Sequence, residues 1–245
     1  MKYSYDLHIH SALSPCAEEE MTPNNIVNMA VVRGIDIIAV TDHNTAGNVE
    51  AISKCAENSS VVFVPGIEVE STEEVHIICL FPDTDSAMAM NRKIRNHLIP
   101  EDNNEAVFGK QYIFDEKDDV IGIEKQMLLF AVDMTAEEVF GAAEKLGGGC
   151  YFAHADRASY SVFSALGTLP DTIGSQIIEL SDNEFGRAFA REKKELKEKT
   201  ILYSSDAHRL ADMSTGNNFI DLPVEKSMLR AENVIEWIRQ RMKRT

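Results

Sequence analysis

Most of the histidines in this sequence stand where strands are expected to end. Six of the seven lie at or just beyond such an end, whereas His97 falls in a helical stretch and is expected to be an ordinary surface residue. In parallel α/β folds the carboxyl ends of the strands gather on one face, where active sites are built. Imidazole nitrogens bind divalent transition metals. The pattern predicts a metal site, and the candidate histidine ligands are His8, His10, His43, His76, His154 and His208.

Two short motifs place paired ligands on one face of a strand. Side chains alternate along a strand, so His8 and His10 point to the same side, about 6 to 7 Å apart. Asp206 and His208 are spaced in the same way. Two histidines on an exposed edge strand would also explain the first motif alone. The second pair at a strand end favours metal binding for both.

Carboxylates add to the candidate site. Glu68 follows an apolar run and is the candidate bridging ligand, because a carboxylate has two oxygens and an imidazole cannot bridge two cations. Glu70 shares its face and is a weaker alternative. Asp42 could orient a neighbouring ligand, since metal-bound histidines often donate their other nitrogen to a carboxylate. Alternatively, Asp42 and Asn44 are turn and capping residues before the next helix.

Together these segments resemble the polymerase and histidinol phosphatase (PHP) family. The resembling segments follow the family's order between residues 6 and 209, and residues 83–135 and those after about 210 are not covered. They are DLHIHS at 6–11, TDHN at 41–44, GIEVES at 66–71, EVHII at 74–78, HADR at 154–157 and SSDAHR at 204–209. The resemblance implies an irregular seven-stranded (β/α)7 barrel and a metal-dependent phosphoesterase with two or three divalent ions.

The resemblance also implies how the ligands are shared among the ions. The expected sets are His8, His10, Glu68 and Asp206 for the first ion, Glu68, His76 and His154 for the second, and His43 and His208 for the third. Glu68 would then bridge two ions, with a shared water or hydroxide between them. Histidine and carboxylate ligands suit zinc, manganese and iron alike, so the metal is not identified.

The sequence departs from the family next to Cys16. Many members have an aspartate seven residues after the first histidine, which completes the third metal site, but here Pro15 stands in that place. Cys16 either supplies a thiolate ligand instead or is a small residue in a turn beside Pro15.

The expected reaction is in-line attack of a metal-bound hydroxide on a phosphoester, because paired metal ions activate water and stabilise a phosphoryl group as charge develops. Arg157, three residues after His154, is the candidate substrate-binding residue, since a guanidinium donates paired hydrogen bonds to phosphate oxygens. A structural salt bridge is the alternative for this arginine. The expected substrate is a small phosphorylated metabolite, a nucleotide or an oligonucleotide end.

Two other functions remain open from the sequence. A metal-dependent amidohydrolase begins with the same HxH pattern but commonly bridges its metals through a carboxylated lysine, and here Glu68 stands at the bridging position. A non-catalytic or regulatory PHP domain would have lost ligands, whereas the set here is nearly complete. A phosphatase assay on metal-loaded protein distinguishes these possibilities.

The elements that position these residues follow from hydrophobic patterning. Short apolar runs alternate with helical patterns, which predicts a mostly parallel sheet with helices outside it. Strands are expected at 5–9, 36–40, 61–65, 75–80, 149–153, 176–180 and 201–205, and helices at 23–33, 47–58, 85–97, 135–146, 183–199 and 231–243. One domain is expected over 1–245, with an insertion or lid near 83–135, because residues 99–123 show no clear period.

The composition excludes several classes of protein. The 245 residues are 44% hydrophobic and 26% charged, as in soluble globular proteins. A formal net charge of -16 argues against an extended nucleic-acid-binding surface. The four cysteines are scattered, no apolar run approaches the roughly 20 residues of a membrane span, and the start lacks a signal-peptide pattern. A cytoplasmic protein with no membrane partner is therefore expected, and its oligomeric state is not indicated.

Overall fold

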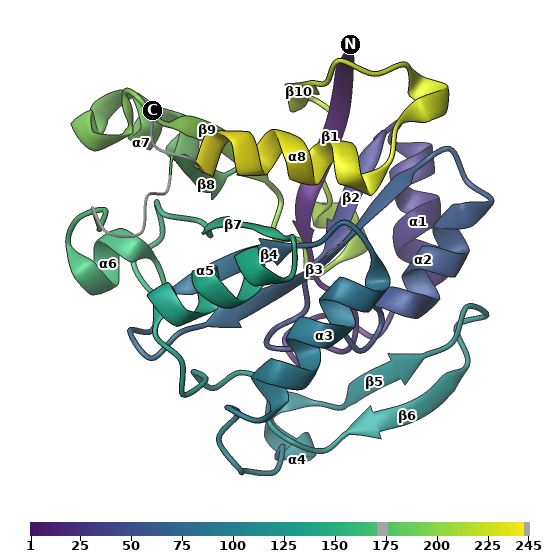
Figure 1. Cartoon of the computed structure of the whole chain (residues 1–245). Coiled ribbons are helices and arrows are strands. Elements are labelled where there is room, and N and C mark those ends of the chain that lie inside the picture. The colour runs from purple at the N-terminus through teal and green to yellow at the C-terminus, as the bar shows by residue number, and fades with distance from the viewer. Residues whose placement is uncertain (171–175, 243–245) are drawn as a thin grey trace.

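A curled mixed sheet forms the centre of the protein (Figure 1). The computed structural model describes residues 1–170 and 176–242. Within these residues the main sheet has eight strands in the order β10-β1-β2-β3-β4-β7-β8-β9. Their bounds are β1 (Lys2–Ile9), β2 (Ile37–Val40), β3 (Val62–Glu70), β4 (His76–Leu80), β7 (Gly149–Phe152), β8 (Ile177–Ser181), β9 (Thr200–Ser204) and β10 (Phe219–Asp221).

The two ends of this sheet meet at β1. Just after β9, Ala207 forms a parallel bridge with Ile9, and its carbonyl accepts a hydrogen bond of 2.9 Å from the His10 amide. At the other end of β1, β10 pairs antiparallel with the first residues of the strand. The predicted α/β fold is confirmed, and the curled sheet forms a half-barrel. The bridge between Ala207 and Ile9 joins its two sides near the carboxyl end of β1.

The sheet is parallel where predicted, except at β4. The pairs β1–β2, β2–β3, β7–β8 and β8–β9 run parallel, whereas β4 runs antiparallel to both β3 and β7. The five residues 71–75 between β3 and β4 are too few for a parallel crossover, so the two strands form a hairpin. The start of β4, at His76, therefore lies at the same edge as the carboxyl ends of the parallel strands.

Apolar side chains pack inside the curled sheet, below the edge at which the parallel strands end. The inner cluster includes Leu7, Ile37, Val64 and Ile78, and side chains of α8 such as Ile238 pack into it. The pairing register of β1 with β2 shifts between Asp6 and Ile9. This irregularity interrupts the strict alternation of side chains along β1. Leu7 therefore belongs to the apolar cluster, and the polar side chain of His8 follows it directly.

Five of the six predicted helices begin and end within two residues of the prediction, and residues 105–108 and 162–166 form two unpredicted short helices among the eight described. Their bounds are α1 (Pro23–Val32), α2 (Val49–Glu57), α3 (Thr84–Arg95), α4 (Glu105–Phe108), α5 (Ala136–Lys145), α6 (Val162–Leu166), α7 (Glu184–Glu192) and α8 (Ala231–Met242). Thr22 and Thr135 cap α1 and α5 with their side chains. The helix expected at 183–199 ends early, because Lys193 has extended backbone and a separate 3-10 turn follows. Residue 243, the last of the helix expected at 231–243, lies outside the described residues.

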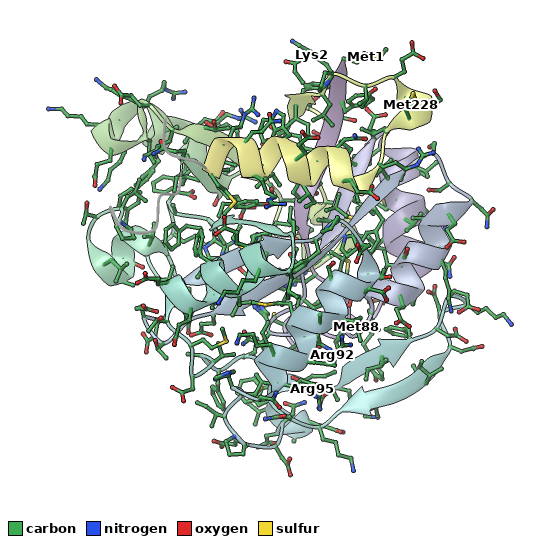
Figure 2. The ribbon with its side chains drawn as sticks, viewed as in Figure 1. Met1, Lys2, Met88, Arg92, Arg95 and Met228 are labelled. Atoms are coloured by element: carbon green, nitrogen blue, oxygen red, sulfur yellow. The ribbon has the colours of Figure 1, made fainter. Side chains whose placement is uncertain are left out.

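The stretch without a clear period contains a separate antiparallel hairpin. Its strands are β5 (Gln111–Phe114) and β6 (Val120–Glu124), and most of β6 is exposed, which explains why it shows no apolar alternation. Arg95 of α3, labelled in Figure 2, pairs with Glu124 of β6. The Tyr112 amide donates to the Ala12 carbonyl at 3.0 Å, so β5 lies against the loop that follows β1. No described helix is long and apolar enough to cross a membrane.

Candidate metal centre

The buried carboxylate of Glu68 is the centre of a histidine cluster. Glu68 lies within β3, which continues through Pro65 and Gly66 instead of ending there as expected. A Cβ atom on Gly66 would approach Leu80 Cδ2 to 2.7 Å, so glycine permits the close approach of β4. Glu68 Oε1 lies 2.8 Å from His76 Nδ1, 3.1 Å from His154 Nε2 and 3.3 Å from His8 Nε2, while Oε2 lies 2.9 Å from His43 Nδ1 and 3.3 Å from His10 Nε2.

Asp206 is a second carboxylate beside the same rings. Its Oδ1 lies 3.0 Å from His10 Nε2, 3.2 Å from His8 Nε2 and 3.6 Å from His208 Nδ1. Asp206 has φ 51° and His154 has φ 26°, in the left-handed region that residues other than glycine seldom adopt. Strained backbone of this kind clusters at functional sites, where the surrounding structure holds it. The structure thus brings together the eight residues predicted as metal ligands.

The donor atoms fit a multinuclear metal site. Glu68 Oε2 and Asp206 Oδ1 are buried oxygens that accept no hydrogen bond from any described residue. Three groups have ligand atoms within 4.8 Å of one another: His8, His10 and Glu68; His43, Glu68 and His76; and His10, His43 and His208. Glu68 belongs to two groups, as a bridging carboxylate must. His10 and His43 also belong to two groups each, whereas the resemblance placed each of them at one ion, and the assignment of each ligand to an ion stays a prediction.

Electrostatics keep the two carboxylates ionised. Burial alone would raise the pKa of Glu68, but His76, His8 and His43 hold that pKa well below its usual value. The same opposition between burial and the nearby histidines lowers the pKa of Asp206. Burial opposes the charged form of His76, yet Glu68 outweighs it and raises the pKa of His76 to about 9. A pair of buried anions among imidazoles is suited to divalent cations.

Several side chains orient the rings. Asp42 accepts hydrogen bonds from the Ser11 hydroxyl at 2.6 Å and from the Ser14 hydroxyl at 2.7 Å, and Ser14 Oγ lies 3.0 Å from His10 Nδ1. Asp42 therefore acts on His10 through Ser14. Asn44, in contrast, is a turn residue with φ 52° whose side chain donates to the Phe130 carbonyl at 3.0 Å.

Glu179 on β8 also belongs to the site, although it was not predicted from the sequence. Its Oε1 lies 2.7 Å from His8 Nδ1 and accepts a hydrogen bond of 3.2 Å from the His154 amide. A carboxylate on the second nitrogen of a candidate ligand fixes the ring tautomer and direction. The signal in the sequence is a single glutamate inside the apolar run 177–180. Glu70, the weaker alternative, lies beside the cluster with Oε2 3.7 Å from His76 Nε2.

Cys16 lies at the outer rim of the cluster. Its Sγ is 3.1 Å from His208 Nε2, although the residue as a whole is exposed. Desolvation of the sulfur, with Glu68 and Asp206 nearby, raises the pKa of the Cys16 thiol to about 12. A thiolate at this place therefore requires a cation to stabilise it.

Arg157 stands over the cluster on the loop after β7. One guanidinium nitrogen lies 2.6 Å from Asp206 Oδ2, and 46% of the side chain is exposed. Arg157 also lines a cavity of about 320 Å³ with Ser205 and Ser214. His97, expected to lie apart, is outside the cluster, with its Nδ1 2.9 Å from the Asp133 carbonyl.

Known proteins are similar in sequence to part of this chain. A 5′-3′ exoribonuclease of Haemophilus influenzae is 28% identical over 83 residues, which are 33% of this chain and 29% of that protein. A 3′,5′-nucleoside bisphosphate phosphatase of Chromobacterium violaceum is 32% identical over 78 residues, 31% of this chain and 26% of that protein. These matches therefore span less than a third of either relative.

The similarity extends to solved structures and to a family description. A lesion-specific endonuclease from Pyrococcus furiosus superposes with a TM-score of 0.68 at 21% identity, over 98% of this chain and 56% of that chain. The family described as "PHP domain" matches residues 6–160. Because this match covers more than half of the 245 residues, the chain belongs to the PHP domain family.

Proposed function

We propose that this protein hydrolyses phosphoesters at a centre of two or three divalent metal ions. The observation that carries the proposal is the convergence of five imidazoles on the buried Glu68 carboxylate, one of whose oxygens accepts no hydrogen bond from the described residues. The proposed ligands are His8, His10, His43, Glu68, His76, His154, Asp206 and His208. The proposed metals are zinc, manganese or iron, which imidazole and carboxylate ligands accept.

The similar proteins support the substrate class. The exoribonuclease and the nucleoside bisphosphate phosphatase are named for action on RNA and on nucleoside bisphosphates. A nucleotide, an oligonucleotide end or another small phosphorylated compound is therefore the proposed substrate. The formal net charge of -16 disfavours an extended nucleic-acid surface, so the protein would bind the end of a strand, not a long duplex.

The chain's own residues would bind and orient the substrate. Divalent cations in this cluster would supply the positive charge that activates water and stabilises phosphoryl oxygens. Arg157 would donate hydrogen bonds to a phosphate oxygen through the exposed part of its guanidinium, while its contact with Asp206 holds it over the cluster. Glu179 and the pair formed by Asp42 and Ser14 would keep the rings of His8 and His10 in place.

A substrate screen with two matched variants tests the proposal. Wild-type protein would be loaded separately with manganese and with zinc and assayed on phosphorylated metabolites and short oligonucleotides. We expect hydrolysis by the wild type and a loss of both metal and activity in Glu68→Gln, because the variant lacks the bridging charge. The control is Glu70→Gln, which should keep its metal, because Glu70 lies two residues further along β3 and its Oε2 is 3.7 Å from the nearest ring, that of His76.

Two results would contradict the proposal. Metal content equal to that of the wild type in Glu68→Gln would rule out the bridging role of this carboxylate. Metal-loaded wild type that hydrolyses none of the phosphoesters would favour the non-catalytic alternative.

A further inference from the structure

The loop after β7 holds three side chains of different chemistry in fixed positions. It carries the candidate ligand His154, then Arg157, then Tyr160. The Arg157 amide donates to the His154 carbonyl at 2.9 Å, and the Ser161 hydroxyl donates to the Arg157 carbonyl at 2.7 Å. Ser161 also caps α6. The loop is therefore a rigid turn that joins the cluster to a helix.

The backbone of Tyr160 is held in a conformation that is unfavourable for tyrosine. Its φ is 56°, in the left-handed region, and its carbonyl accepts a hydrogen bond of 3.0 Å from the His76 amide. A bulky residue in this region is uncommon and is kept where the surrounding structure requires it. The conformation fixes the tyrosine beside the first residue of β4, at the edge of the cluster.

One face of the Tyr160 ring is covered and the residue is half exposed. The ring stacks on the imidazole of His76, with 4.9 Å between centroids and 23° between planes. No other aromatic ring among the described residues stacks on it, and 49% of the residue is exposed. The hydroxyl makes no hydrogen bond to a described residue, so the ring, not the hydroxyl, is the part that the fold positions.

We infer that Tyr160 is a specificity-determining residue that stacks on an aromatic group of the phosphoester. The inference rests on the proposed function and adds a substrate class, namely esters whose alcohol portion carries a nucleobase or a similar ring. Aromatic side chains stack on every base because each base has a π-face. His76 supports the inner face of Tyr160, and Arg157 from the same loop would hold the phosphate. The pair would select a substrate with both groups.

A pair of probes that differ in one ring tests this role. Adenosine 5′-monophosphate and ribose 5-phosphate share the phosphate and the sugar, and only the first has a base. Tyr160→Leu should lower kcat/KM for the nucleotide by roughly 5- to 100-fold, the loss expected for one stacked base, and should leave ribose 5-phosphate within about twofold. Tyr160→Phe should retain wild-type values for both. Phe219→Leu is the control, because Phe219 is 56% exposed on β10, which pairs with the start of β1.

Each other outcome has a definite meaning. An equal loss on both probes, with metal content reduced, would show that Tyr160 only supports His76. An unchanged preference for the nucleotide in Tyr160→Leu would overturn the inference. If the wild type hydrolyses neither probe, the proposed hydrolysis is wrong for these two esters. The stacking role of Tyr160 is then tested by calorimetry, as the binding of both probes to metal-loaded protein. Tighter binding of the nucleotide that is lost in Tyr160→Leu would support it, and equal binding by both proteins would overturn it.

Discussion

At the scale of single residues, the candidate site consists of ligands and of the side chains that aim them. An imidazole presents a lone pair to a metal only in one tautomer and ring orientation. Glu179 faces the second nitrogen of His8, and Ser14, held by Asp42, faces that of His10. Two rings of the cluster are thus oriented from outside it.

Arg157 gives the first prediction at this scale. Arg157→Ala should lower kcat/KM for a phosphomonoester by roughly 10- to 1,000-fold, because a charge-assisted contact is lost from the transition state. Metal content should stay normal. Steady-state kinetics and elemental analysis check both points. Arg187→Ala is a matched control, since Arg187 is 42% exposed and pairs with Asp182. Near wild-type kinetics in Arg157→Ala would leave only the salt bridge with Asp206 as its role.

Cys16 gives the second prediction. Its Sγ lies 3.1 Å from His208 Nε2, so a cation held by His43 and His208 would be within reach of the thiolate. A thiolate favours zinc over manganese. Cys16→Ser should then release roughly one zinc per chain, while the pair of ions bridged by Glu68 persists. Metal stoichiometry and alkylation rates measured with and without zinc check this. Equal metal counts and equal alkylation rates would show that Cys16 is a turn residue.

The sequence predicted the ligands better than the residues that orient them. His8, Glu68 and Asp206 stand out because polar residues interrupt apolar runs at strand ends. Glu179 lies inside such a run, and its role depends on how β8 curls round to face β1. That relation between distant strands has no local signature in the sequence.

At the scale of elements, most strand and helix positions followed from local patterning, whereas strand direction, the β5–β6 hairpin and the short strand β10 did not. The run 75–80 reads as a buried strand in either direction, and the short link from β3 decides that β4 is antiparallel. β3 was predicted too short because Pro65 and Gly66 resemble a strand end. Pro65 is tolerated because it lies in the strand where the pairing partner changes from β2 to β4.

The contact of the β5–β6 hairpin with Asn48, the residue just before α2, gives a prediction at this scale. The buried side chain of Asn48 accepts a hydrogen bond of 2.9 Å from the Phe114 amide and donates to the Tyr112 carbonyl at 3.1 Å and the Ser11 hydroxyl at 2.9 Å. Asn48→Ala should lower the free energy of unfolding by about 1 to 3 kcal/mol, because buried partners lose their hydrogen bonds. Urea denaturation measures this.

The exposed Asn217 provides the control, since among the described residues its side-chain amide hydrogen-bonds only the hydroxyl of Thr215, two positions earlier. Asn217→Ala should change the free energy of unfolding by less than about 0.5 kcal/mol. Equal stability of Asn48→Ala and the wild type would mean that the hairpin does not depend on Asn48.

At the scale of the whole molecule, the negative net charge and the buried carboxylates predict that bound metal ions stabilise the fold. The chain carries 40 acidic and 24 basic residues, and two of the acidic residues, Glu68 and Asp206, are ionised carboxylates inside the cluster. Divalent cations would offset this charge where it is most concentrated. Ligands that bind only the folded state stabilise it, so removal of metal by a chelator should lower the melting temperature.

The stability of the metal-free protein is expected to depend on pH. Burial lowers the pKa of His43 from 6.5 to about 4 and that of His208 from 6.5 to about 3. Between these values and 6.5 the two histidines bind protons only in the unfolded chain, so they lower stability as the pH falls below 6.5, whereas burial raises the pKa of Asp6 and Asp42 and these carboxyls act in the opposite direction. Denaturation at a series of pH values checks the sign. We expect the two histidines to dominate near pH 6, and stability that rises on acidification from 6.5 would show that Asp6 and Asp42 outweigh them.

Anomalous diffraction from crystals of the metal-loaded protein tests directly whether Glu68 bridges two metal ions. Data collected on both sides of the zinc or manganese absorption edge locate each ion independently of any assay. We expect at least two peaks that share the Glu68 carboxylate, one beside His8, His10 and Asp206 and one beside His76 and His154. A single peak away from Glu68, or no peak in this cluster, would contradict it.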